Sequence, residues 1–133
     1  MKRLLLLAPM MLAVAACATS DRPGMNAPPV GEFRPLNLPN QSFASIDAVM
    51  DHYRGERQDH VTYEDAEGRP TDGFGDRLLL FSASGYHDDS VEAEQWRVTV
   101  DQTDRGYRVV EAGVRFKCAR GDRRGEWRSS LCP

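Results

Sequence analysis

The chain has 133 residues, which is enough for one ordinary domain, and a formal net charge of −3. Residues 47–104 carry 15 acidic and 5 basic side chains, whereas residues 114–133 carry 6 basic and 2 acidic ones. Because nucleic-acid-binding domains are characteristically basic, this acidic chain is expected to have no nucleic-acid partner.

The first 16 residues have the composition of a secretory signal. Lys2 and Arg3 precede an apolar run from Leu4 to Ala16 that contains no acidic residue. A membrane-spanning helix needs about 20 apolar residues, whereas this run is shorter and is interrupted by Pro9. We therefore predict a signal peptide over residues 1–16, whose removal would leave 15 basic against 20 acidic residues, a net charge of −5.

The residues Val14, Ala15, Ala16 and Cys17 resemble a lipobox, the motif at which bacterial lipoproteins are modified and cleaved. The resemblance implies a diacylglyceryl group on the Cys17 thiol and an acyl group on its amine after cleavage. Each buried methylene stabilises membrane attachment by about 0.8 kcal/mol, so several acyl chains hold durably. Ala18 stands where an aspartate resembles an inner-membrane retention signal, which favours the outer membrane. The alternative is an ordinary signal peptide with an unmodified Cys17.

Lipidation of Cys17 would leave Cys118 and Cys132 as an even pair in an oxidising, periplasm-facing compartment. Closing a loop of about 15 residues stabilises a small domain by about 3 kcal/mol in the chain-entropy model, so we predict a structural disulfide. A metal pair would need closer cysteine spacing or clustered histidines, and a catalytic thiol would need an activating neighbour. We expect neither a metal nor a cofactor.

Proline dominates the segment that follows the proposed lipidation site. Residues 17–40 contain Pro23, Pro28, Pro29, Pro35 and Pro39. Such a composition opposes helix and sheet and favours extended, solvated backbone. We predict a tether over residues 17–40 and a small periplasmic domain over residues 41–133.

Apolar side chains then recur at helical spacing, at Ile46, Val49, Met50 and Tyr53. Ser45 precedes them as an N-cap and Gly55 follows as a C-terminal stop, so we predict a helix from 46 to 54.

The remaining segments favour β-structure. We predict a short strand over 61–63, a buried strand around 78–81, and two alternating strands over 96–100 and 107–118, with a bulge at Gly113. The expected fold is α+β, one N-terminal helix packed on a three- to four-stranded antiparallel meander, with a C-terminal loop closed by the cysteine pair.

Two polar groups of residues could carry chemistry. His87, Asp88 and Asp89 could bind a divalent ion or exchange protons, although turns select aspartate for backbone hydrogen bonding alone. Residues 72–76 lack the ligand spacing of an EF-hand, so we interpret them as a flexible loop. No Gly-x-Ser-x-Gly motif surrounds any serine.

A basic cluster lies inside the loop between Cys118 and Cys132. Several guanidinium groups close together can hold phosphate or carboxylate bidentately. The alternative is a solvated loop whose tryptophan covers the edge of the sheet. The candidate anion- or partner-binding residues are Arg120, Arg123, Arg124, Trp127 and Arg128.

The C-terminal part of the chain also resembles small uncharacterised proteobacterial envelope proteins. The resemblance implies no activity, and it rests on Trp96, Gly106, Gly113, Cys118, Trp127 and Cys132.

The leading functional hypothesis is a membrane-anchored lipoprotein of the cell envelope with a non-enzymatic binding or assembly role. Its expected partners are the membrane, through the lipid, and another envelope protein or an anionic envelope component. One alternative is a small-ligand carrier with an apolar cavity beneath Met50 and Tyr53, and the other is an enzyme using His87, Asp88 and Asp89.

Overall fold

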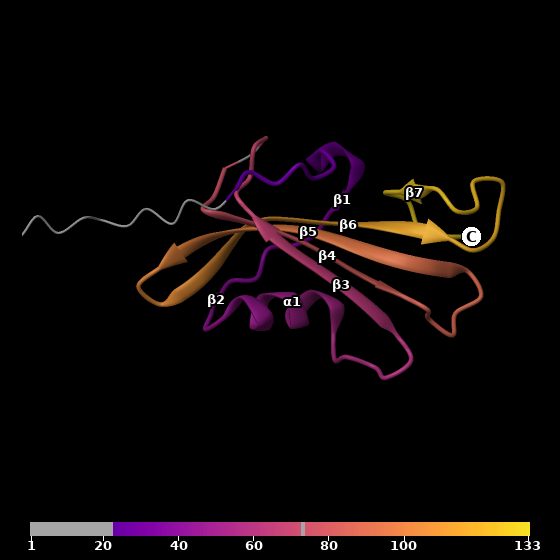
Figure 1. Cartoon of the computed structure of the whole chain (residues 1–133), viewed down its shortest axis with the longest axis horizontal. Coiled ribbons are helices and arrows are strands. Elements are labelled where there is room, and N and C mark those ends of the chain that lie inside the picture. The colour runs from indigo at the N-terminus through magenta and orange to yellow at the C-terminus, as the bar shows by residue number, and fades with distance from the viewer. Residues whose placement is uncertain (1–22, 73) are drawn as a thin grey trace, which may run out of the picture.

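A long antiparallel hairpin of β5 (Val91–Thr103) and β6 (Gly106–Cys118) forms the centre of a single sheet (Figure 1). The computed structural model describes residues 23–72 and 74–133, so the predicted signal peptide and Cys17 lie outside the described residues. Gly106 opens β6 at a φ of 108°, and a Cβ there would lie 2.1 Å from the Phe43 carbonyl oxygen. The tight turn and this close approach both require glycine.

Five further strands extend the hairpin. β4 (Arg77–Ser84) pairs with β5, and β3 (Thr62–Gly68) pairs with β4. Three two-residue strands pair with β6: β1 (Arg34–Pro35), β2 (Ser42–Phe43) and β7 (Trp127–Arg128). All these pairings are antiparallel, and the main path of the sheet runs β1-β6-β5-β4-β3.

One face of the sheet is covered by α1 (Ile46–Arg54), and the predicted helix bounds are confirmed. The Ser45 hydroxyl accepts a hydrogen bond from the Ala48 amide at 3.1 Å, as expected of an N-cap. The helix buries Val49 and Met50 against the sheet. Their partners are alternate apolar residues of the strands, including Leu79, Phe81, Trp96, Val98, Val114 and Phe116.

The opposite face is covered by segments from both ends of the described chain and by the loop that contains Asp72. Figure 1 shows α1 on one side of the sheet and, on the other, β7 and the segment with the short 3₁₀ helix η1 (Val30–Glu32). Phe33 is only 4% exposed, and a Cβ on Gly113 would lie 2.7 Å from the Phe33 Cβ. Gly113 therefore makes room for a phenylalanine ring.

The predicted bulge at Gly113 is wrong. Gly113 lies in register opposite Arg97, and the register of the β5–β6 hairpin shifts instead at Val91/Ala93 and at Thr99/Val100. A glycine inside a strand marks either a bulge or a close packing contact, and here it marks the contact.

The predicted α+β fold class is also wrong. The described chain is mostly β, with seven strands in one antiparallel sheet and a single short α-helix, rather than a helix on a three- to four-stranded meander. The three two-residue strands are too short to show any alternation, and their pairing depends on docking against β6. Because β1 and Phe33 already lie on the sheet, packed structure begins before residue 41, within the segment predicted as a tether.

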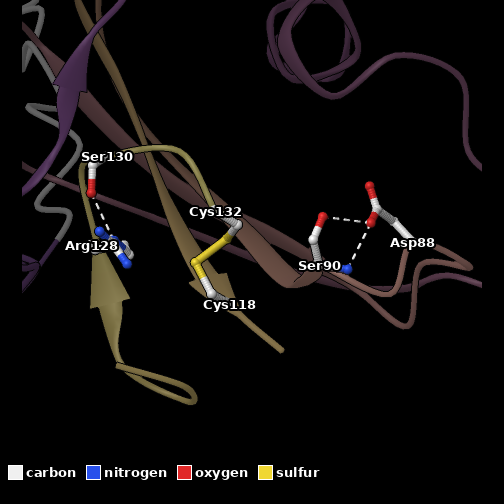
Figure 2. The surroundings of a disulfide bond; sticks show 6 residues. All are labelled: Asp88, Ser90, Cys118, Arg128, Ser130 and Cys132. Carbon is white, nitrogen blue, oxygen red and sulfur yellow. Dashed lines mark hydrogen bonds between the residues drawn. A yellow bond between two sulfur atoms is a disulfide. The ribbon is translucent and has the colours of Figure 1, made fainter. Parts of the chain in front are cut away.

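The predicted disulfide is confirmed. Cys118 ends β6 and is bonded to Cys132 with a Cα–Cα distance of 5.4 Å (Figure 2). Within the described residues, no helix has the length and apolar character needed to span a membrane.

Reducing this disulfide is expected to lower the free energy of unfolding by about 3 kcal/mol, because an unfolded chain without the crosslink gains loop entropy. Urea unfolding of the purified chain with and without dithiothreitol measures the difference. A Cys118→Ala/Cys132→Ala variant is the control and should be insensitive to the reductant. Equal wild-type stability in both conditions would contradict the prediction.

Candidate functional site

The two ends of the described chain meet at the buried side chain of Arg115. The Arg115 guanidinium carbon lies 4.9 Å from the ring centroid of Phe33 and 4.9 Å from that of Trp127. Its Nη1 donates a hydrogen bond to Glu32 Oε2 at 2.6 Å, and its Nε donates to Gln95 Oε1 at 2.9 Å. A single cation therefore holds the N-terminal segment and the C-terminal loop against the same face of the sheet.

Burial lowers the pKa of the Arg115 guanidinium, and the nearby Glu32 carboxylate opposes that shift. Because an arginine begins with a pKa far above neutrality, Arg115 keeps its charge. Its side chain is 9% exposed, against 54% for Glu32. The positive charge is therefore desolvated, while the carboxylate remains open to water.

A groove opens beside this contact, between η1 and the disulfide-closed loop. It has a volume of about 440 Å³. Its lining consists of two arginines, one tryptophan, two serines and one glutamate: Glu32, Arg123, Trp127, Arg128, Ser129 and Ser130. Figure 2 shows Arg128 and Ser130 close to the Cys118–Cys132 bridge. The disulfide and Arg115 thus position the two sides of the groove.

The groove has an excess of positive charge. Arg128 Nε donates to the Ser130 hydroxyl at 2.7 Å, and no carboxylate in the described part of the chain forms an ion pair with Arg128. Arg123 forms an exposed ion pair with Glu126 at 3.0 Å, and such pairs contribute little. Glu32 is already bonded to Arg115. The groove therefore offers two guanidinium groups to an incoming anion.

The structure divides the predicted arginine cluster. Arg123, Trp127 and Arg128 line the groove, whereas Arg120 forms an ion pair with Asp89 at 3.0 Å on the neighbouring turn. Arg124 is exposed and makes no ion pair or hydrogen bond with the described residues.

Several residues of the groove region could not be recognised from the sequence. Arg115 alternates with buried Val114 and Phe116 and is expected on the solvent side, but its face of the sheet is covered. Glu32 lies 83 positions before Arg115, and no sequence signal joins the two. Ser129 and Ser130, in contrast, directly follow the predicted cluster.

The three residues considered for catalysis have three different partners. Asp88 Oδ1 accepts hydrogen bonds from the Ser90 amide at 2.8 Å and the Ser90 hydroxyl at 2.7 Å (Figure 2). The hydrogen bond from the Ser90 amide makes the largest contribution to lowering the pKa of Asp88, and the bond from the Ser90 hydroxyl lowers it further. Asp89 pairs with Arg120, and the His87 ring lies 4.1 Å from the ring of His60. Asp88 therefore serves the turn, as aspartates in turns commonly do.

The loop considered for calcium binding provides a structural ion pair instead. Asp72 accepts a hydrogen bond from the fully buried Arg97, which also donates to Glu111. Asp76 accepts from the Gln102 amide at 2.9 Å, so the two loop aspartates serve separate partners. Among the described residues, no group of three or more histidine, cysteine, aspartate or glutamate side chains is placed to hold a metal.

The small-ligand-carrier hypothesis requires an apolar cavity beneath Met50 and Tyr53, but the groove beside α1 is partly acidic. It has a volume of about 230 Å³, and three of its seven lining residues, Asp47, Asp65 and Glu67, are acidic. Tyr53 lines no part of it and packs against the core, where burial raises the pKa of its phenol to about 12.

A half-buried polar contact lies on the α1 face. The Tyr86 hydroxyl donates to Glu94 Oε2 at 3.0 Å. Burial raises the pKa of both groups, and the Glu94 charge raises that of Tyr86 further. The contact satisfies two polar groups beside the core, and it was not expected from the sequence.

Comparison with known proteins gives no relative: no protein-family model, curated protein or solved structure matches this chain.

Replacing Arg115 with alanine is expected to destabilise the fold by about 2–4 kcal/mol, because it removes two ring contacts and two hydrogen bonds. Urea unfolding measures the loss, and red-shifted tryptophan emission would report the release of Trp127. Arg115→Lys keeps the charge but not the flat, bidentate guanidinium, so it should recover less than half of the loss. Full recovery by lysine would show that charge alone matters.

Proposed function

We propose that this protein is a lipid-anchored component of the bacterial cell envelope whose C-terminal loop binds an anionic envelope component without converting it chemically. The basic N-terminus, the apolar run and Cys17 support export and lipidation. The Cys118–Cys132 disulfide is consistent with an oxidising compartment outside the cytoplasm. The outer membrane is favoured by Ala18, which stands where a retention aspartate would lie.

One observation carries the binding role: two arginines line the same groove as a tryptophan, and Arg128 forms no ion pair with the described residues. Guanidinium groups form short, charge-assisted hydrogen bonds to carboxylate and phosphate oxygens. Envelope glycans and lipid headgroups supply both kinds of anion, and a partner protein could supply carboxylates.

The anchor and the groove are close in the sequence. Fifteen residue steps separate Cys17 from Glu32, the first lining residue. Such a segment spans at most about 50 Å when fully extended. The groove would therefore work within a layer of that depth beside the membrane.

The anchoring part of the proposal is tested at the mature N-terminus. Mass spectrometry of the protein from its native host should show a chain beginning at Cys17 and carrying the mass of acyl chains. A Cys17→Ser variant should lose the acyl mass and move from the membrane to the soluble fraction. A native chain that begins at Met1 without lipid would contradict the proposal.

The binding part is tested with inorganic polyphosphate, an anion that contains no sugar or lipid. We expect the detergent-solubilised full chain to bind it, and Arg123→Gln/Arg128→Gln to weaken binding at least about 10-fold in isothermal titration calorimetry, because two charge-assisted contacts are lost. Arg57→Gln/Arg69→Gln removes the same charge outside the groove and is the matched control. Equal losses in both variants would show that net charge, rather than the groove, binds anions.

A further inference from the structure

We infer that the groove binds an anionic saccharide, a pyranose unit that carries a carboxylate or a phosphate. This inference rests on the proposed function and narrows it from any anion to one class of ligand. It is drawn from the chemistry of the six lining residues and from the way Arg115 holds Trp127.

The residues that line the groove suit a flat ligand with polar groups around its edge. Five of the six lining residues are charged or hydroxylic, and Trp127 is the single large apolar group. An apolar ligand would desolvate these five polar side chains without offering any of them a new hydrogen bond, at a cost for each. A pyranose ring has hydroxyl groups around its rim and C–H groups on its faces, so it satisfies the polar side chains and covers the indole.

Trp127 is held in place before any ligand arrives. Arg115 covers one side of the indole at 4.9 Å and is itself fixed by Phe33, Glu32 and Gln95. The partly exposed remainder of the indole lines the groove. An aromatic surface that is already immobilised costs little conformational entropy on binding, which is the basis of preorganised recognition.

The polar residues divide between charge and hydroxyl recognition. Arg128 and Arg123 supply the cations for a carboxylate or phosphate. Ser129 makes no hydrogen bond with the described residues, and Glu32 is bonded through Oε2 only. A serine hydroxyl can donate or accept, and a carboxylate oxygen accepts from a sugar hydroxyl.

The size of the groove also favours a sugar over a simple oxyanion. Its volume of about 440 Å³ lies within the range of about 300–1,000 Å³ typical of small-molecule sites. An isolated phosphate could contact Arg128 but would leave Trp127 unused. One or two sugar rings would contact both Arg128 and Trp127.

Calorimetry on the detergent-solubilised full chain tests the inference with four probes: a hyaluronan tetrasaccharide, neutral chitotetraose, glucose 1-phosphate and inorganic phosphate. Hyaluronan alternates a carboxylated sugar with N-acetylglucosamine, so chitotetraose matches it in length without the charge. We expect hyaluronan or glucose 1-phosphate to bind at least about 10-fold more tightly than both chitotetraose and inorganic phosphate. Which of the two binds more tightly identifies the anionic group.

Two variants separate the sugar contact from the charge contact. Trp127→Ala should weaken the preferred saccharide at least about 10-fold and inorganic phosphate by a clearly smaller factor, whereas Trp127→Phe should retain most of the saccharide affinity. Arg128→Gln should weaken the charged saccharide by a larger factor than chitotetraose. Because Trp127 contacts Arg115, the Trp127 variants also change a contact that stabilises the fold. Ser129 is exposed, so Ser129→Ala should weaken saccharide binding without lowering thermal stability.

The outcomes distinguish the two proposals. If inorganic phosphate binds as tightly as either charged sugar, and Trp127→Ala changes nothing, the saccharide inference is overturned while arginine-dependent anion binding stands. If none of these probes and no polyphosphate binds, the saccharide inference and the proposed binding role are both overturned.

Discussion

The burial of Arg115 between two aromatic rings is the interaction on which the candidate site depends. Phe33 comes from the segment before β1 and Trp127 from the disulfide-closed loop, and the two residues are far apart in the chain. Arg115 therefore joins the segment that contains η1 to that loop beside the groove. The desolvated guanidinium must keep its hydrogen bonds to Glu32 and Gln95, which fixes both sides of the groove in one geometry.

The sheet is covered on both faces, and the two coverings differ in kind. The α1 face is an ordinary apolar core built around Val49, Phe81 and Val98. The other face buries two arginines, Arg97 and Arg115, each paired with acidic groups from loops or from the neighbouring strand. Each buried arginine requires its acidic partner in place, because loss of the partner would leave an uncompensated buried charge. We interpret the second face as the one that orders the loops and the groove.

The proposed function combines a lipid anchor with an anion-binding groove. The lipid on Cys17 would hold the protein at the membrane, and the groove would bind the anion. The Cys118–Cys132 disulfide keeps the short β7 beside β6. The groove is also lined by Glu32, which belongs to the segment that would lead from the proposed anchor. Under this proposal, attachment and binding would be parts of one arrangement, in which the segment that follows the lipidated cysteine would form one wall of the groove.

The sequence by itself determined the features that rest on local physics. The helix over Ile46–Arg54 follows from apolar spacing and its cap, and much of β5 and β6 follows from alternation. The Cys118–Cys132 pair follows from the count of three cysteines once Cys17 is assigned to the lipobox. Three groove residues, Arg123, Trp127 and Arg128, were also within the predicted cluster.

Only the tertiary structure decided the fold class, the role of Gly113 and the composition of the groove. Strands of two residues have no readable period, and a strand residue such as Arg115 looks solvent-facing unless the covering segment is known. The contact between Glu32 and Arg115 spans 83 positions, and such long-range contacts leave no local pattern. Packing of distant segments, rather than propensity, placed these residues together.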